Sequence, residues 1–174
     1  MITIRPLNGQ RWPDLEAIFT AKGRSFARGR WCMFYRESGK TNLPGGMTLP
    51  DYRRAQVKAR ADRAPAPGLI AYHGKVPVGW VAVAPRHEYA KLVRSSVMKP
   101  VDDKPVWSII CFVVPSQYRH QGVATALLQG AISTPNVMGR RCLRHTRSTR
   151  LNREATAGCG TAPSRCMTRR ASWR

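Results

Sequence analysis

A short basic turn in front of a predicted helix is the part of this sequence whose residue types and spacing can do chemistry. The turn is Gln117-Tyr-Arg-His-Gln-Gly122. The first N–H groups of a helix have no partner within it, and they lie at the positive end of the helix dipole. Gly122 has no Cβ, so a ligand can approach its backbone closely, while Arg119 and His120 add positive charge. The turn therefore predicts a site for a phosphate or another anion.

The elements on either side of this turn must hold it in place. Residues 106–114 are nearly all apolar, which predicts a central strand covered on both faces, and Pro115 ends that strand. After the turn, apolar residues recur at helical spacing and predict the helix Ala124–Ile132. Strand, glycine-containing basic turn and helix, in this order, form a phosphate-binding arrangement.

The run Arg119-His-Gln-Gly-Val-Ala124 fits the pattern R/Q-x-x-G-x-G/A, and in this the chain resembles the GNAT superfamily of N-acetyltransferases. The preceding strand, the following helix and an upstream β-hairpin with Gly79 and Trp80 also match the family order. The resemblance covers about residues 1–132. It implies an α/β fold, with a mixed, mostly antiparallel twisted sheet flanked by helices. It also implies an acyltransferase that moves an acetyl group from acetyl-coenzyme A to an amine.

The resemblance further implies how acetyl-coenzyme A would bind as cosubstrate. The pantetheine arm would pair with the backbone of Phe112 and Val114, and an N–H near Val113 or Val114 would polarise the thioester carbonyl. The pyrophosphate would accept hydrogen bonds from the turn. The candidate binding residues are Phe112, Val113, Val114, Arg119, His120, Gln121, Gly122, Val123, Ala124 and Thr125.

The general base that the reaction needs is not assigned by the sequence. The candidates are Ser108 and Cys111 in the apolar strand and Glu88, Asp102 and Asp103 in the connection before it. We expect the three carboxylates to be solvated loop residues. We expect Cys111 to be a small buried residue rather than a nucleophile. The acceptor amine also stays open.

Other patterns predict the remaining elements of the N-terminal part. They are a strand over Ile2–Leu7, a helix from Pro13, a helix with Thr48 as N-cap and Asp51 in a capping box, and a hairpin of Leu69–Tyr72 and Val78–Val83. Residues 22–47 are expected to be irregular or weakly helical, and residues 86–103 a charged connection. The run Trp31-Cys-Met-Phe-Tyr-Arg36 either lines the acceptor pocket or packs in the core, and core packing is favoured.

Composition sets broader limits. The chain has 174 residues, 43% of them hydrophobic, and a net charge of +21, which favours polyanionic partners. No apolar run approaches the roughly 20 residues of a membrane helix, so no membrane partner is expected. The N-terminus lacks the apolar stretch of a secretory signal, and we expect a cytoplasmic protein. The five cysteines are then free thiols. The oligomeric state is left open.

Residues 133–174 depart from the family pattern. They hold ten Arg and one acidic residue, with little apolar periodicity, and we expect a basic, disordered tail in place of a fifth strand and a helix carrying a catalytic Tyr. A reading-frame shift near Ile132 would account for this. With third bases left free, the displaced frame can spell VLEAYPVD within residues 134–150 and MYDAAGF within residues 151–174, both similar to the missing family half. Such a product would bind cofactor weakly and be nearly inactive.

The tail also allows two other interpretations. Cys142, His145, Cys159 and Cys166 supply zinc-ligand types, but the spacing from Cys159 to Cys166 is too wide for common zinc pairs, and no metal site is assigned. The Arg-rich tail favours non-specific binding to polyanions, so a basic nucleic-acid-binding protein is the alternative function. Trp173 is its only aromatic residue, and no stacking platform is formed.

Overall fold

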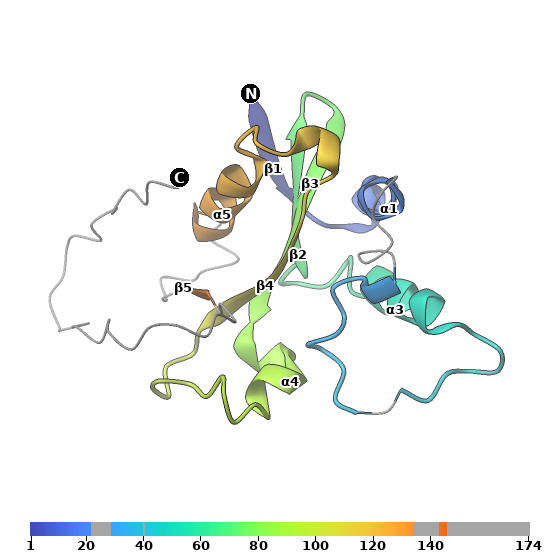
Figure 1. Ribbon diagram of the computed structural model, residues 1–174, viewed down its shortest axis with the longest axis vertical. Helices are drawn as coiled ribbons and strands as arrows, with labels where there is room; N and C mark the ends of the chain where they lie inside the picture. The colour runs from blue at the N-terminus through green and yellow to red at the C-terminus, as the bar shows by residue number, and fades with distance from the viewer. Residues whose placement is uncertain (22–28, 40, 134–142, 146–174) are drawn as a thin grey trace, which may run out of the picture.

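The computed structural model describes residues 1–21, 29–39, 41–133 and 143–145. Within them lies a five-stranded sheet in the order β1-β2-β3-β4-β5 (Figure 1). The strands are β1 (Ile2–Pro6), β2 (Gly68–His73), β3 (Val76–Pro85), β4 (Trp107–Val113) and β5 (Leu143–His145). The first four pair antiparallel and β5 runs parallel to β4, so the predicted mixed, mostly antiparallel sheet is confirmed.

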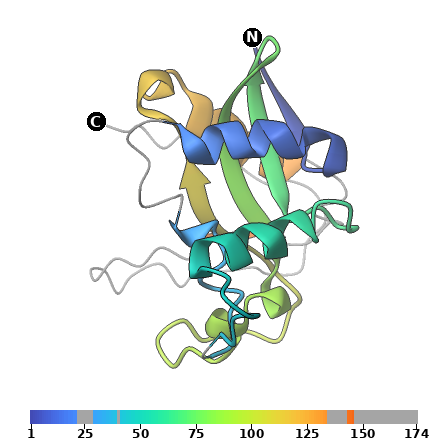
Figure 2. The ribbon, with the colours of Figure 1, turned by 90° about the vertical axis from the view of Figure 1, so that its right-hand side faces the viewer.

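Helices cover both faces of the sheet. The longer helices are α1 (Trp12–Thr20), α3 (Leu49–Lys58) and α5 (Val123–Ser133), and α4 (Ala90–Val93) is a single turn. Figures 1 and 2 show α1 and α3 lying across one face of the strands and α5 on the other. This three-layer arrangement buries both sides of β2 and β3, which explains their long apolar runs.

Local signals in the sequence account for the helix starts. Pro13 occupies the first turn of α1, where its missing N–H costs nothing. Thr48 caps α3: its Oγ1 accepts a bond from the Asp51 N–H at 3.3 Å and donates to Asp51 Oδ2 at 2.6 Å. The predicted N-cap is confirmed, and Asp51 lies at the capping-box position but accepts a bond from the Thr48 hydroxyl rather than from the Thr48 N–H.

Alternate residues of the strands divide the core into two layers. Ile70, Tyr72 and Trp80 face α1 and α3, where they pack with Leu15 and Phe19. The opposite side chains, those of Leu69, Ala71, Val78, Val81 and Val83, pack against Val123, Leu127 and Ala131 of α5. Burial of these apolar surfaces on both sides is the main stabilising contribution to the fold.

A β-bulge interrupts the pairing of β3 with β4. Ala82 pairs with Cys111, but the next residue, Val83, pairs with Ile109, so Ile110 is the extra residue in β4. As a result two consecutive side chains, those of Ile110 and Cys111, pack on the α1 and α3 side. Phe112 returns to the α5 side.

Two stretches differ from the sequence prediction. The charged connection 86–103 contains α4, which forms because Tyr89 and Leu92 are fully buried against Ala84. No fifth strand was expected after residue 132, and this was wrong for Leu143–His145, which pair with Trp107–Ile109. Pairing of this kind uses backbone groups and needs no apolar periodicity. No helix in the described ranges is long and apolar enough to span a membrane.

Candidate functional site

The basic turn joins the end of β4 to the start of α5. A single 3-10 turn (Ser116–Tyr118) comes first, and then the backbone enters the left-handed region twice, at His120 with φ +61° and at Gly122 with φ +74°. The carbonyl of Gly122 accepts the N–H of Ala126 at 2.9 Å, so Gly122 is the N-cap residue of α5. A Cβ placed on Gly122 would meet nothing within 4 Å, which leaves open space above this backbone.

The backbone amides at the end of this turn have no partner among the described residues. The N–H groups of Tyr118 and Arg119 bond back to Pro115 and Ser116, and the side-chain amide of Gln121 braces the turn by donating to the Gln117 carbonyl at 2.8 Å. In the described part of the chain, no acceptor is bonded to the amides of residues 120–125. These donors lie at the positive end of the α5 dipole, so the turn is suited to hold an anion.

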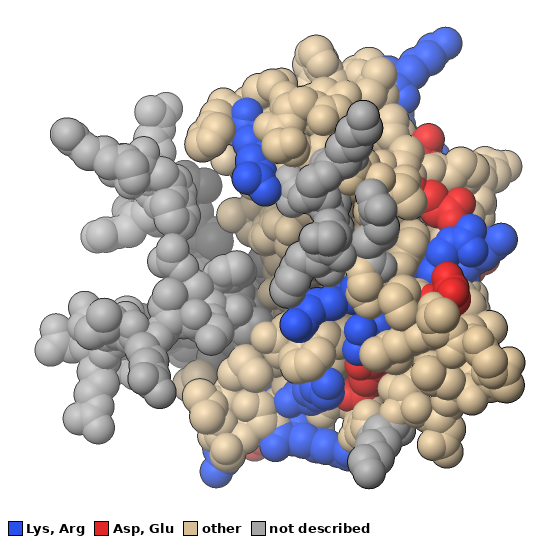
Figure 3. Space-filling view, turned by 45° about the vertical axis from the view of Figure 1, so that its right-hand side comes forward, with Lys and Arg blue, Asp and Glu red and all other residues tan. Residues whose placement is uncertain are grey.

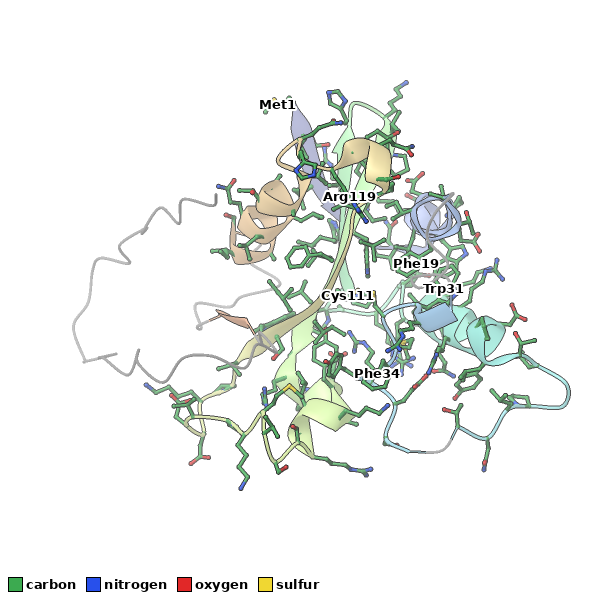
Figure 4. The ribbon with its side chains drawn as sticks, in the orientation of Figure 1. Met1, Phe19, Trp31, Phe34, Cys111 and Arg119 are labelled. Carbon is green, nitrogen blue, oxygen red and sulfur yellow. The ribbon has the colours of Figure 1, made fainter. Side chains whose placement is uncertain are left out.

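Two glycines seat α5 close to the sheet and so position the turn. Gly79 in β3 lies under Val123, which is 3% exposed, and Gly130 in α5 lies over Ile4 of β1. Val123 is therefore an anchor of the helix, while Ala124 and Thr125 are exposed beside it. Arg119 and His120 are exposed as well, beyond the end of β4, and Figure 4 labels Arg119 there.

The second half of β4 offers a free edge next to this turn. β5 pairs with β4 only at Trp107–Ile109, and among the described residues no strand pairs with the same edge from Ile110 to Val113. Phe112 and Val114 are half-buried on the α5 side, and Val113 is buried on the other. The structure thus brings the predicted strand residues and the predicted turn residues to one end of the sheet.

The candidates for the general base lie elsewhere. Ser108 is fully buried and its hydroxyl has no partner among the described residues. Asp102 and Asp103 line a cavity of about 690 Å³ at the opposite end of β4. Glu88 was expected to be a solvated loop carboxylate; its side chain is 32% exposed, but it also forms an ion pair with Arg36, which the sequence did not indicate.

Cys111 has a partner that the sequence did not reveal. Its thiol interacts with the thiol of Cys32, and both lie on the α1 and α3 side of the sheet, the side of Trp31 (Figure 4). Burial raises the pKa of Cys32, and the hydrogen bond from Cys32 lowers the pKa of Cys111. The described residues hold no group of three or more His, Cys, Asp or Glu side chains that could bind a metal ion.

The aromatic run from Trp31 to Arg36 divides between two environments. Trp31 stacks on Phe19 at 4.7 Å between ring centroids and on Trp12 at 5.8 Å, so core packing is confirmed for this residue. Phe34 is 39% exposed. Arg36 lines a polar pocket of about 300 Å³ between this segment and α3.

Residues 31–152, which include this run, β4 and the basic turn, match the family model described as the acetyltransferase (GNAT) family. The chain belongs to this family. The resemblance carried by the motif is thereby confirmed, and so is the acyltransferase class that it implied. A comparison with curated protein sequences gives no significant match.

Solved structures of other GNAT proteins share the fold. The aminoglycoside N-acetyltransferase AAC(6′)-Iy, in complex with CoA, is 18% identical with a TM-score of 0.53, and the match covers 85% of this chain and 78% of that one. An aminoglycoside acetyltransferase, HMB0005, from an uncultured soil metagenomic sample is 16% identical with a TM-score of 0.52, over 87% and 82% of the two chains. The ribosomal-protein-alanine N-acetyltransferase of Brucella melitensis biovar Abortus 2308 is 15% identical with a TM-score of 0.51, over 84% and 80%.

Several predictions concern residues outside the described part. They are the disorder of the tail, the displaced reading frame and the zinc-ligand types Cys142, Cys159 and Cys166. His145 lies in β5, and only its backbone is described. Sequence reasoning also missed the Arg36–Glu88 pair and the Cys32–Cys111 contact. The sequence carries no signal for either, since each joins segments more than fifty residues apart.

Proposed function

We propose that this GNAT protein binds acetyl-coenzyme A at the turn 119–125 and transfers the acetyl group to an amine. The observation that carries the proposal is the set of unpaired amides of residues 120–125 at the start of α5, beside the free edge of β4. The pyrophosphate of coenzyme A is a dianion, and these amides with Arg119 supply the donors and the charge that it needs.

The residues present fit such a ligand. Gly122 leaves open space over its backbone, so a phosphate meets no side chain there. Val123, seated on Gly79, fixes the direction of the first helical turn. The family resemblance puts the pantetheine amides along β4, at the backbone of Phe112 and Val114, and among the described residues no strand pairs with this edge from Ile110 to Val113. The bulge at Ile110 turns the strand at the point where the thioester would lie.

The chemical step requires an amine nucleophile, a polarised thioester carbonyl and an acceptor for the amine proton. We assign polarisation to a backbone N–H near Val113 or Val114, because a fixed donor aimed at a developing oxyanion lowers the barrier. The amine would approach from the α1 and α3 side of β4, opposite to the helix that holds the pyrophosphate. The proton acceptor is a water molecule or a carboxylate that this proposal leaves unassigned.

The end of the chain bears on how active this protein is. We propose that the sequence from about residue 133 comes from a displaced reading frame. The short strand β5 falls inside residues 134–150, where the displaced frame spells the strand VLEAYPVD. The chain as it stands would then retain the pyrophosphate turn but turn over slowly. The encoding DNA from codon 125 onward tests this: a stop codon within a few codons of the displaced frame overturns it.

Coenzyme A binding is tested by thermal unfolding and by calorimetry. Coenzyme A should raise the unfolding temperature of the parent chain, and Arg119→Glu combined with Gly122→Glu should abolish the rise. Arg63→Glu is the control, since Arg63 is equally exposed but lies far from the turn in sequence, after α3. If the double variant holds coenzyme A as tightly as the parent, the assignment is wrong. Salt-sensitive DNA binding without any effect of coenzyme A would favour the nucleic-acid alternative.

A further inference from the structure

A polar pocket on the α1 and α3 side of the sheet is not used by coenzyme A in the function proposed above. It has a volume of about 300 Å³ and lies between α3 and the segment that follows Trp31. The side chains that matter here are Arg36, Glu37, Thr41, Asn42, Tyr52 and Arg60. Nearly all of them are polar, so the pocket is built to hold a polar or charged group rather than an apolar one.

The charges in this pocket do not balance. Glu37 is fully engaged by Arg53, which donates from Nε at 2.5 Å and from Nη2 at 2.8 Å. Arg36 forms its ion pair with Glu88. Among the described residues Arg60 forms no ion pair with a carboxylate, and its Nη1 bonds to the carbonyl and the side-chain oxygen of Gln56. One guanidinium in the lining is therefore left without an ion-pair partner among the described residues, although the Glu88 carboxylate attracts it from a distance.

One of the lining residues, Arg36, also holds an unused donor. Nη2 of Arg36 is buried and has no hydrogen-bond partner among the described residues. The whole side chain of Arg36 is only 5% exposed. A buried charged donor without an acceptor is costly, and the cost is removed when an anionic oxygen binds it. Burial and the nearby charges of Arg36 and Arg63 lower the pKa of Arg60, which agrees with an excess of positive charge at this place. On the lower part of the face in Figure 3, blue basic side chains cover more of the surface than red acidic ones do.

The pocket lies on the side of the sheet to which the side chains of Ile110 and Cys111, at the bulge in β4, point. The segment that lines it begins at Met33, next to Cys32, whose thiol touches Cys111 in β4. The Arg36 guanidinium lies over the ring of Tyr89 at 4.6 Å, and Tyr89 packs with Ile110 at the bulge. An amine that reaches β4 from this side can therefore keep another part of its structure in the pocket.

We propose that the pocket binds a carboxylate of the acceptor substrate, held by Arg36 and Arg60, so that the acceptor is an amine that also carries a carboxylate. One uncompensated guanidinium matches one negative charge, which favours a carboxylate over a doubly charged phosphate. The neutral donors Thr41, Asn42 and Tyr52 complete the set around such a group. The inference rests on the function proposed above, because it assumes that an amine is acetylated at β4.

The test compares amino acids with the same molecules lacking the carboxylate. Binding of lysine and ornithine is measured by calorimetry against that of cadaverine and putrescine, with and without coenzyme A. Lysine or ornithine should bind the parent chain at least about tenfold more tightly than its decarboxylated counterpart, as expected for one charged hydrogen-bonded pair. Equal binding within each pair, or no binding of either amino acid, overturns the proposal, as does tighter binding of O-phosphoethanolamine.

Variants assign the effect to the pocket. Arg60→Gln should remove most of the preference for the amino acid, and Arg60→Lys, which keeps the charge without the planar fork, should retain part of it. Arg5→Gln removes an equal charge from an exposed residue of β1 outside the pocket lining and should leave the preference unchanged; an equal loss in this control would indicate a general charge effect and overturn the proposal. Circular dichroism confirms that each variant is folded. If coenzyme A fails to bind but lysine binds through Arg60, the proposed function fails while the carboxylate site stands.

Discussion

Gly79 of β3 and Val123 of α5 are in direct apposition: a Cβ added to Gly79 would lie 2.7 Å from Cγ1 of Val123. The same added atom would lie 3.2 Å from Leu127 Cδ1. The absence of a side chain in the strand thus fixes how deeply the first turn of the helix is seated. The direction in which the amides of Ala124 and Thr125 point depends on this contact.

Gly79→Ala should move the start of α5 and weaken coenzyme A binding more than it weakens the fold. Overpacking at a site of this kind costs about 1–3 kcal/mol of unfolding free energy. Gly79→Ala with Val123→Ala should recover much of both losses, because the second change restores the space. Gly45→Ala is the control, since its added Cβ would meet nothing within 4 Å. Urea unfolding and calorimetry with coenzyme A measure the two effects, and an unchanged affinity in Gly79→Ala would contradict the prediction.

His120→Gly should stabilise the protein. His120 has φ +61°, a left-handed conformation that costs a residue with a Cβ roughly 1–2 kcal/mol, and glycine adopts it without that cost. After the greater loss of chain entropy for glycine, we expect a gain of about 0.5–1 kcal/mol in the free energy of unfolding. Chemical denaturation measures it, with His120→Ala as the comparison that changes the side chain but keeps the Cβ. A loss of stability in His120→Gly would show that the turn is held differently.

Cys32→Ala should raise the pKa of Cys111. The hydrogen bond from the Cys32 thiol favours the thiolate of Cys111 and lowers its pKa against the opposing effect of burial. Without that donor, alkylation of Cys111 should begin at higher pH than in the parent chain. Mass spectrometry of the peptide that contains Cys111 follows the reaction at several pH values. Identical pH profiles in the two proteins would mean that the thiols do not interact.

Tyr72→Phe should destabilise the packing of β2 on α1. The Tyr72 hydroxyl donates to Asp14 Oδ2 at 2.7 Å, and loss of such a bond costs about 1–2 kcal/mol. Burial and this bond raise the pKa of Tyr72. Because the folded state holds the proton more tightly, its contribution is complete below the unfolded pKa near 10 and falls as pH rises above it. Unfolding measured from neutral to alkaline pH should show a steeper decline in the parent than in Tyr72→Phe, and equal slopes would contradict this.

Local signals in the sequence predicted the parts of the fold that depend on neighbouring residues. Thr48 and Asp51 lie three positions apart, and the hairpin of β2 and β3 closes around Gly74. The residues that determine each of these features therefore lie within a short stretch of sequence. The glycine-containing turn before α5 was predicted for the same reason, although its left-handed backbone at His120 and Gly122 was not. These features of the fold and of the candidate site follow from spacing alone.

Features that join distant segments could not be predicted in this way. Arg36 and Glu88 form an ion pair because the segment after Trp31 lies beside the residues that follow β3. The sequence around either residue gives no sign of its partner. The bulge at Ile110 is equally hidden, since an all-apolar strand shows no break in pattern when one residue is inserted. The imbalance of charge around Arg60 appears only once its neighbours are known in space.

The bulge at Ile110 determines which changes in length the strand β4 tolerates. Both faces of this strand contact apolar layers, so a frame of side chains displaced by one position would still be hydrophobic on each side. Burial therefore does not favour one register of β4 over another. Only the hydrogen bonds to β3 fix the register. Closing the bulge without removing a residue would give a regular strand in which Phe112 and Val113 had exchanged sides, whereas deletion of Ile110 would leave both on their present sides. For this reason insertions in residues 107–113, and deletions other than that of Ile110, should be far more damaging than substitutions of one apolar residue by another.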